Sequence, residues 1–233
     1  MGETSKRVAF FTAEHGKLTA VAKGARKPKS KFGGSLELMN EVDALLYVRA
    51  DRDLQTLSEC ALDRSFPRLI GNFERLSFGS AACELVDRLV IDSEPNKQLY
   101  RCISGVLGAL DEVSDSQIEP IFWYYQLRVC QALGYKPELR HCVSCGGSAN
   151  GPNRCVSTAL GGIVCKACAA VDDQQAMRIS NESINFLVHL QGLRTYHRDA
   201  IPELPANASE PRKILSGFLE FHAERRESLR SLQ

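Results

Sequence analysis

The chain has 233 residues, of which 44% are hydrophobic, with 29 Lys and Arg against 28 Asp and Glu. This length and apolar content suffice for one large domain or two smaller ones. No apolar run is long enough to span a membrane, and the first residues lack the apolar core of a secretory signal. We therefore expect a cytoplasmic protein that does not cross a membrane.

Positive charge is concentrated near the start of the chain. Residues 1–36 contain eight Lys and Arg against two Glu, whereas the remainder carries an excess of acidic residues. Such segregation predicts a cationic surface on an otherwise nearly neutral protein. An anionic partner is the expectation that follows.

The first 65 residues are predicted to be rich in β-strands. Short β-prone runs lie at 8–12, 17–23, 42–50 and 54–62. Gly16 can adopt the positive φ that a tight turn between the first two runs requires. The sequence thus predicts a small β-barrel or meander over 1–65, as the first of two domains.

The sequence KGARKPKSKFGGSL, residues 23–36, lies between the second and third β-prone runs. Pro28 and the Gly33-Gly34 pair favour a loop, which disfavours membrane attachment through an amphipathic helix. Cations in a loop can neutralise nucleic-acid phosphates without regular secondary structure; the alternative is a loop that is merely solvated. The candidate phosphate contacts are Lys17, Lys23, Arg26, Lys27, Lys29 and Lys31.

From residue 66 onward, apolar residues recur at helical spacing and predict a second, all-helical domain over 66–233. The expected helices are 67–89, 95–112, 116–133, 181–193 and 211–231. The first has its apolar positions at Leu69, Phe73, Leu76, Ala81, Leu85 and Leu89.

Capping residues help to define these helices. Pro95 is expected in the first turn of the second helix, Gly134 at the end of the third, and Ser180 as the cap of the fourth. Trp123 and its two tyrosine neighbours are expected in the core of the third helix, not on a base-stacking surface. The fold class is therefore α+β.

Nine cysteines are present, and in a reducing cytosol they are not expected to form disulfides. Four form two C-x2-C pairs separated by 19 residues: Cys142 with Cys145, and Cys165 with Cys168. This spacing, with four soft thiolate ligands, predicts one structural zinc ion in a module at 139–170. Cys155 and His141 are the only nearby substitute ligands, and the alternatives are a pair of coincidental dithiols or a redox switch that releases metal.

No catalytic residue is predicted. The sequence lacks a phosphate-binding P-loop, a nucleophile elbow and a helical zinc-protease motif. Its five histidines are scattered without carboxylate partners at a recognisable spacing. We expect a binding protein and not an enzyme.

Three blocks carry a resemblance to a known family: TAEHGKLTAVAKGARKPKSKFGGSLE, LGYKPELRHCVSCGG and GGIVCKACAA. Their order and spacing resemble those of the RecO family of bacterial recombination mediators. The resemblance implies an N-terminal OB-fold that binds single- and double-stranded DNA, followed by a helical domain interrupted by the zinc module. It also implies annealing of complementary strands, and cooperation with RecR in helping RecA displace single-strand binding protein, whose C-terminal tail the helical domain would receive.

One difference from the family concerns the start of the chain. Members of the family usually begin earlier, with one more strand ahead of MGETSKR. Two explanations are open: the reading frame starts late, or this OB-fold lacks its first strand and exposes an unpaired edge. The rival to the whole interpretation is a redox-regulated zinc protein, a chaperone or sensor, whose basic loop is incidental.

Overall fold

The computed structural model describes residues 3–49, 51–90, 94–148, 154–172 and 176–230. The chain forms two compact units, Met1–Asp111 and Glu112–Gln233. The change from strands to helices occurs between Arg64 and Pro67, but the division into domains 1–65 and 66–233 stays a prediction. In the described ranges, no helix is both long and apolar enough to cross a membrane.

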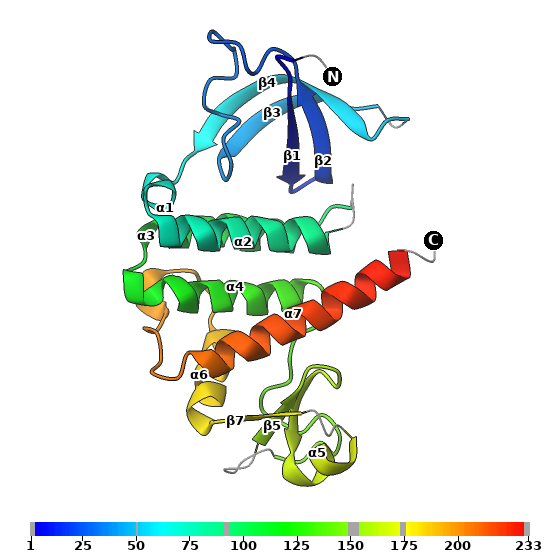
Figure 1. Cartoon of the computed structure of the whole chain (residues 1–233), viewed down its shortest axis with the longest axis vertical. Coiled ribbons are helices and arrows are strands. Elements are labelled where there is room, and N and C mark those ends of the chain that lie inside the picture. The colour runs from blue at the N-terminus through cyan, green and yellow to red at the C-terminus, as the bar shows by residue number, and fades with distance from the viewer. Residues whose placement is uncertain (1–2, 50, 91–93, 149–153, 173–175, 231–233) are drawn as a thin grey trace. The chain divides into compact units, whose positions relative to one another are not determined.

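Four strands form the sheet of the first unit (Figure 1). They are β1 (Lys6–Thr12), β2 (Gly16–Ala22), β3 (Glu41–Tyr47) and β4 (Leu54–Arg64), in the order β1-β2-β4-β3. The outer pairs are antiparallel, whereas β2 and β4 are parallel neighbours. Gly16 has a φ of 65° in the β1–β2 turn, which confirms the predicted turn. The predicted third strand included residue 50, which lies outside the described residues.

Alternation along β2 separates the two faces of this sheet. Every second residue of β2 is buried, so one face packs on a core and the other faces outward. The core combines Ala20, Ala22 and Leu57 of the strands with Phe32 and Leu36 of the basic segment. Residues from the segment between β2 and β3 therefore complete the interior of the sheet.

Three helices complete the first unit: α1 (Pro67–Gly71), α2 (Phe73–Leu89) and α3 (Lys97–Glu112). The apolar face of α3 is buried, including all of its Leu, Ile, Val and Cys residues. Pro95 lies before the helix and not in its first turn, because Asn96 is the cap and its Oδ1 accepts from Leu99 N at 2.8 Å.

The predicted apolar positions of the helix 67–89 were only partly right: Leu69 and Leu89 are buried, but the positions between them do not form the buried face of α2. Phe73 is 87% exposed, whereas Gly79, Ala82 and Val86 lie on the buried face with Arg75. The guanidinium of Arg75 donates to the carbonyl of Leu110 on α3 at 2.6 Å, which satisfies a buried charge that an apolar pattern does not reveal.

In the described residues, the second unit is built on three longer helices, with two short 3-10 turns. The helices are α4 (Ile118–Ala132), α6 (Asn181–Gly192) and α7 (Ser209–Arg230); the turns are η1 (Asp115–Gln117) and η2 (Arg198–Ala200). Ser180 caps α6 through Ser183 N, and Gly134 follows α4 with a φ of 83°, as predicted. Residue 231 of the predicted last helix lies outside the described residues.

The aromatic cluster of α4 belongs to the core. Trp123, Tyr124 and Tyr125 are all at most 1% exposed. Trp123 packs edge-on against Phe186 of α6, with ring centroids 5.7 Å apart. These residues hold helices together and do not form a base-stacking surface, as the sequence predicted.

A small sheet, β6-β5-β7, completes the second unit. It consists of β5 (Arg154–Ser157), β6 (Gly162–Cys165) and β7 (Met177–Ile179), and the short helix α5 (Lys166–Asp172) follows β6 directly. The second C-x2-C pair thus spans the junction of β6 and α5.

Gly16 provides a test of the fold of the first unit. An alanine at position 16 would have to adopt a positive φ, which is strained for a residue with a side chain, and its Cβ would overlap the backbone of Glu94. We expect Gly16→Ala to lower the free energy of unfolding by roughly 1–3 kcal/mol in urea denaturation. Gly34→Ala is the control, because nothing lies within 4 Å of its added methyl group. Equal destabilisation by both substitutions would contradict this role for Gly16.

Candidate nucleic-acid interface and metal centre

The basic loop, defined here as residues 23–36, is a chain of tight turns that exposes its charges. Backbone N–H groups of Lys27, Ser30 and Gly33 each donate to the carbonyl three residues earlier, at 3.0–3.3 Å. Gly24 and Gly33 take positive φ values, which allows the chain to reverse repeatedly. The five cations of the loop, at positions 23, 26, 27, 29 and 31, are all exposed.

Apolar anchors fix the base of this loop. Phe32 and Leu36 are buried in the core of the sheet. Lys6 of β1 donates to the carbonyl of Leu36 at 2.7 Å, and the Ser35 hydroxyl donates to the carbonyl of Phe32 at 2.5 Å. The charges are therefore presented on a backbone held at its far end, which lowers the entropy lost on binding a ligand.

The structure brings together five of the six candidate phosphate contacts. Lys23 and Lys27 line a cavity of about 750 Å³ together with Val21 and Leu54 of neighbouring strands. Lys17 lies at the opposite end of β2, where its Nζ forms an ion pair with Asp87 at 3.3 Å. Lys17 is therefore separated from the basic loop by the length of a strand.

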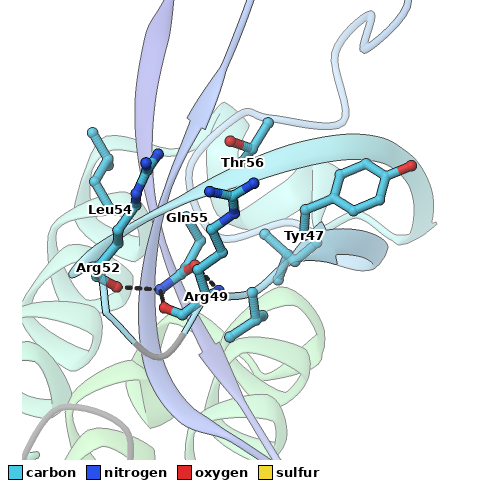
Figure 2. A pocket seen from close by; sticks show the side chains of 8 residues that line it. Tyr47, Arg49, Arg52, Leu54, Gln55 and Thr56 are labelled. Carbon is cyan, nitrogen blue, oxygen red and sulfur yellow. Dashed lines mark hydrogen bonds between the residues drawn. The ribbon is translucent and has the colours of Figure 1, made fainter.

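A second cavity, of about 450 Å³, lies at the β3–β4 hairpin and includes residues that sequence reasoning missed (Figure 2). Tyr47, Arg49 and Arg52 line it, together with Leu54 and Thr56. The only signal in the sequence was a pair of arginines in the short segment between two β-prone runs. Their approach to the basic loop depends on strand pairing that a local pattern does not predict.

One buried side chain organises this hairpin. Gln55 is 6% exposed, and its Oε1 accepts from Arg49 N at 2.8 Å. Its Nε2 donates to the carbonyl of Arg49 at 3.2 Å and to that of Arg52 at 2.5 Å. A single amide thus holds the backbone at both arginines, and their side chains extend into solvent.

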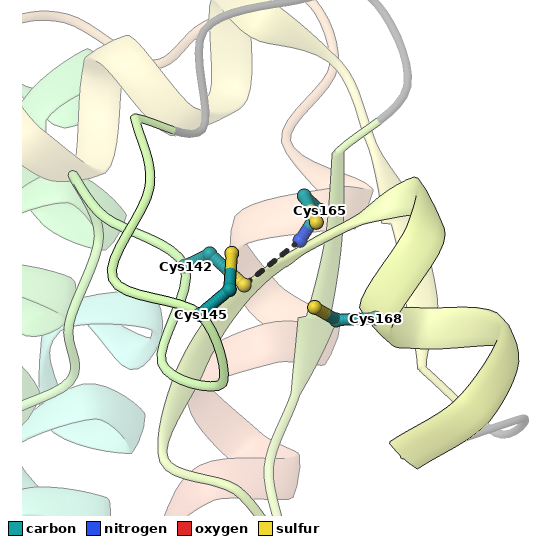
Figure 3. Close-up of side chains that lie close together, drawn as sticks. All are labelled: Cys142, Cys145, Cys165 and Cys168. Carbon is teal, nitrogen blue, oxygen red and sulfur yellow. Dashed lines mark hydrogen bonds between the residues drawn. The ribbon is translucent and has the colours of Figure 1, made fainter.

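The four paired cysteines converge in the second unit (Figure 3). The sulfurs of Cys142, Cys145, Cys165 and Cys168 all lie within 4.8 Å of one another. In the first pair, Gly146 has a φ of 69° and its N–H donates to the carbonyl of Cys142 at 2.8 Å, which closes the turn. The backbone N–H of Cys165 donates to the sulfur of Cys142 at 3.4 Å and links the two pairs.

This geometry fits a tetrahedral metal ion. Four sulfurs about 2.3 Å from a common centre are separated by roughly 3.8 Å, which is compatible with the four sulfurs lying within 4.8 Å of one another. Burial by itself would raise the pKa of Cys142. Hydrogen bonds from the backbone N–H groups of Cys165, Cys145 and Ser144 have the larger combined effect, and the pKa of Cys142 is lowered to about 6. The pKa of Cys168 is raised to about 12, mainly by a hydrogen bond with the Cys165 side chain and to a smaller extent by burial. A divalent cation would displace the thiol protons, because a coordinating thiol is deprotonated.

The two possible substitute ligands do not join the four sulfurs. Cys155 is buried in the small apolar core beside Cys142 and Val164. His141 is directed to Glu138, with its Nδ1 3.7 Å from the carboxylate. Within the described residues, the group that could hold a metal consists of the four paired cysteines.

The thiols on the long helices have the properties of buried apolar side chains. Burial raises the pKa of Cys83 to about 11 and that of Cys130 to about 12. Such thiols are poor nucleophiles at neutral pH. Cys102 and Cys130 are buried and Cys83 is partly buried, which fits a role in apolar packing.

The fold and these sites define a mixed α+β protein with a cationic sheet and a four-cysteine cluster that could hold a metal ion. The chain matches two family models, "Recombination protein O N terminal" over residues 1–66 and "Recombination protein O C terminal" over 70–233. It is similar to "DNA repair protein RecO" of Symbiobacterium thermophilum, at 32% identity over 96% of this chain and 88% of that relative.

Two further relatives carry the same name. "DNA repair protein RecO" of Pelotomaculum thermopropionicum is 31% identical over 96% of this chain and 85% of its own length. That of Cutibacterium acnes is 32% identical over 100% of this chain and 92% of its own length. The chain therefore belongs to the RecO family of DNA repair proteins.

The anchoring of the basic loop can be tested with Phe32→Ala. Removal of this buried ring should lower the free energy of unfolding by about 3 kcal/mol and accelerate tryptic cleavage within 23–31 in limited proteolysis. Leu38→Ala is the control, because Leu38 is exposed just beyond the same loop. If the Phe32→Ala protein is destabilised but its tryptic cleavage within 23–31 is unchanged, burial of Phe32 does not restrain the loop.

Proposed function

We propose that this protein is a recombination mediator that binds single- and double-stranded DNA and anneals complementary strands. With RecR, it would help load RecA onto DNA coated by single-strand binding protein, whose C-terminal tail it would bind. The observation that carries the proposal is the exposed, anchored basic loop on the small sheet of a RecO-family chain. We further propose that the protein acts in the cytoplasm and performs no catalysis.

The arrangement of strands supports an OB-fold for the N-terminal region. The OB-fold is a five-stranded, partly open Greek-key barrel. The four strands here, with β2 and β4 as parallel neighbours, are not a simple meander and leave β1 and β3 at the edges of the sheet. We propose that they represent four strands of such a barrel.

The proposed DNA contacts are electrostatic. Lys23, Arg26, Lys27, Lys29 and Lys31 would neutralise phosphates and release condensed counterions. The ion pair between Lys17 and Asp87 would have to break before Lys17 could bind a phosphate. Contacts of this kind leave the pairing edges of the bases free and reduce repulsion between two strands, as annealing requires.

We also propose that the four-cysteine cluster holds one structural zinc ion. Four thiolate ligands leave no open coordination position, so the ion would stabilise the fold and supply no reaction step. A redox-regulated zinc protein is the second candidate, because the same thiols would release metal on oxidation. Zinc release by mild peroxide that leaves DNA binding unchanged favours the first candidate; DNA binding that switches with oxidation favours the second.

The DNA-binding proposal predicts a steep dependence on salt. For single-stranded oligonucleotides, the basic loop should contribute roughly 3 to the slope magnitude of log Kd against log salt if it neutralises four to five phosphates. Replacement of Arg26, Lys27 and Lys29 together by Ala should reduce that slope by about 2 and weaken binding of all sequences alike. Fluorescence anisotropy at several salt concentrations measures both quantities.

The matched control removes three charges elsewhere in the same unit: Arg88, Lys97 and Arg101 are exposed on helices α2 and α3. We expect their joint replacement by Ala to leave most of the slope intact. If the control and the loop variant lose affinity equally, general charge and not the basic loop determines binding.

Zinc content tests the metal proposal. Purified, reduced protein should contain one zinc per chain by elemental analysis. Cys142→Ser or Cys168→Ser should remove it and lower the melting temperature, because a structural metal contributes folding free energy. Cys83→Ser should retain it, since Cys83 lies outside the cluster. A metal-free wild-type protein with unchanged stability would contradict the proposal.

A further inference from the structure

The outward face of the first sheet carries a row of side chains that crosses all four strands. Arg7 of β1 lies opposite Val21 of β2, Val21 opposite Thr56 of β4, and Thr56 opposite Tyr47 of β3. Residues directly opposite one another share a face, and the core residues Ala20, Ala22 and Leu57 occupy the other one. This outer row spans roughly 14 Å across three strand spacings.

The two cavities described above share a lining residue on this face. Val21 lines the cavity of the basic loop, and Thr56 and Tyr47 line the hairpin cavity. Leu54, at the start of β4, lines both. A ligand that follows the outer row would therefore pass from Lys23 and Lys27 to the hairpin by way of Leu54.

The hairpin end of this path has the side chains that a nucleotide requires. Arg49 and Arg52 are exposed, and among the described residues no carboxylate forms an ion pair with either guanidinium. Asp51 and Asp53 lie beside them in the sequence, so the hairpin has no net charge of its own. Planar guanidinium groups can nonetheless bind individual phosphates in a bidentate manner.

Tyr47 is suited to an unpaired base. Tyr47 is 66% exposed and lines the hairpin cavity, although an aromatic residue of this size is usually more buried. An exposed ring can stack on an unpaired base of any identity. Bases of a duplex are stacked on each other, so only a single strand can use Tyr47 in this way.

We propose that one strand of DNA crosses the outer row, with a base stacked on Tyr47 and phosphates bound by Arg49 and Arg52. The strand continues past Leu54 to the basic loop. The inference rests on the proposed DNA binding and adds to it a second, hairpin subsite that prefers single strands. Gln55 acts as a positioning residue, because it fixes the backbone from which both arginines extend.

The two halves of the subsite differ in their dependence on salt. Tyr47→Ala should weaken binding of a single-stranded oligonucleotide roughly 10-fold and leave the salt slope unchanged, because stacking releases no counterions. Tyr47→Phe should retain binding. Replacement of Arg49 and Arg52 together by Ala should reduce the slope by about 1.4, since each phosphate on a single strand contributes about 0.7.

Matched controls remove the same groups elsewhere in the first unit. Phe73→Ala deletes another exposed aromatic ring, and the joint replacement of Lys97 and Arg101 by Ala deletes two other exposed cations. None of these residues lines either cavity. We expect both controls to bind as the wild type does, and Tyr47→Ala to bind duplex DNA unchanged.

Fluorescence gives a direct readout of stacking. The chain has a single tryptophan, Trp123, which is buried, so Tyr47→Trp adds an exposed reporter to a nearly constant background. Titration with oligothymidine should quench this added emission in parallel with the rise in anisotropy. Emission that stays constant at saturating oligonucleotide would overturn the proposed stacking.

The outcomes separate this inference from the proposed function. If the wild-type protein fails to bind DNA at low salt, the proposed function fails and the subsite with it. If the wild type binds, and the basic-loop variant is weakened while Tyr47→Ala and the Arg49 and Arg52 variant match the wild type, the hairpin subsite alone is wrong. Selective loss of single-strand binding in the Tyr47→Ala protein supports it.

Discussion

The parallel pairing of β2 with β4 determines where the cationic surface of this protein forms. Parallel neighbours cannot be joined by a tight turn, so the chain between them must make a long excursion. Here that excursion contains the basic loop and β3. Only Thr19–Val21 pairs with Leu54–Thr56, so β4 begins beside the end of β2, close to the start of the loop. Two cation-bearing segments that are distant in sequence thereby border one face of the sheet.

Buried residues hold the basic loop and the β3–β4 hairpin in place on this face of the sheet. Exposed lysines contribute little to stability, and a loop that carries five of them repels itself. Phe32 and Leu36 offset that repulsion by burial in the core of the sheet, and Gln55 performs the corresponding task for the hairpin through hydrogen bonds. The charged surface is thus supported by interactions that lie beneath it. In the second unit, the four cysteines tie a turn to the β6–α5 junction in a region with few large apolar side chains.

Local sequence patterns predicted the features whose causes are local. Gly16, the turns of the basic loop, the Ser180 cap and the two C-x2-C pairs each depend on a few adjacent residues. The apolar face of α3 was also predictable, because its period is regular. The face of α2 was not, since its buried side contains Gly79 and an arginine satisfied by a carbonyl 35 residues away. Likewise, the engagement of Lys17 with Asp87 and the role of the β3–β4 hairpin depend on contacts between distant parts of the sequence.

Ultraviolet cross-linking of the full chain to a short oligothymidine, followed by peptide mass spectrometry, tests most directly whether DNA lies on the first sheet. We expect adducts within residues 23–36 and at the hairpin around Tyr47, competed by unlabelled single strands and diminished at high salt. Adducts confined to residues 112–233, with none in the first unit under conditions of full binding, would contradict this expectation.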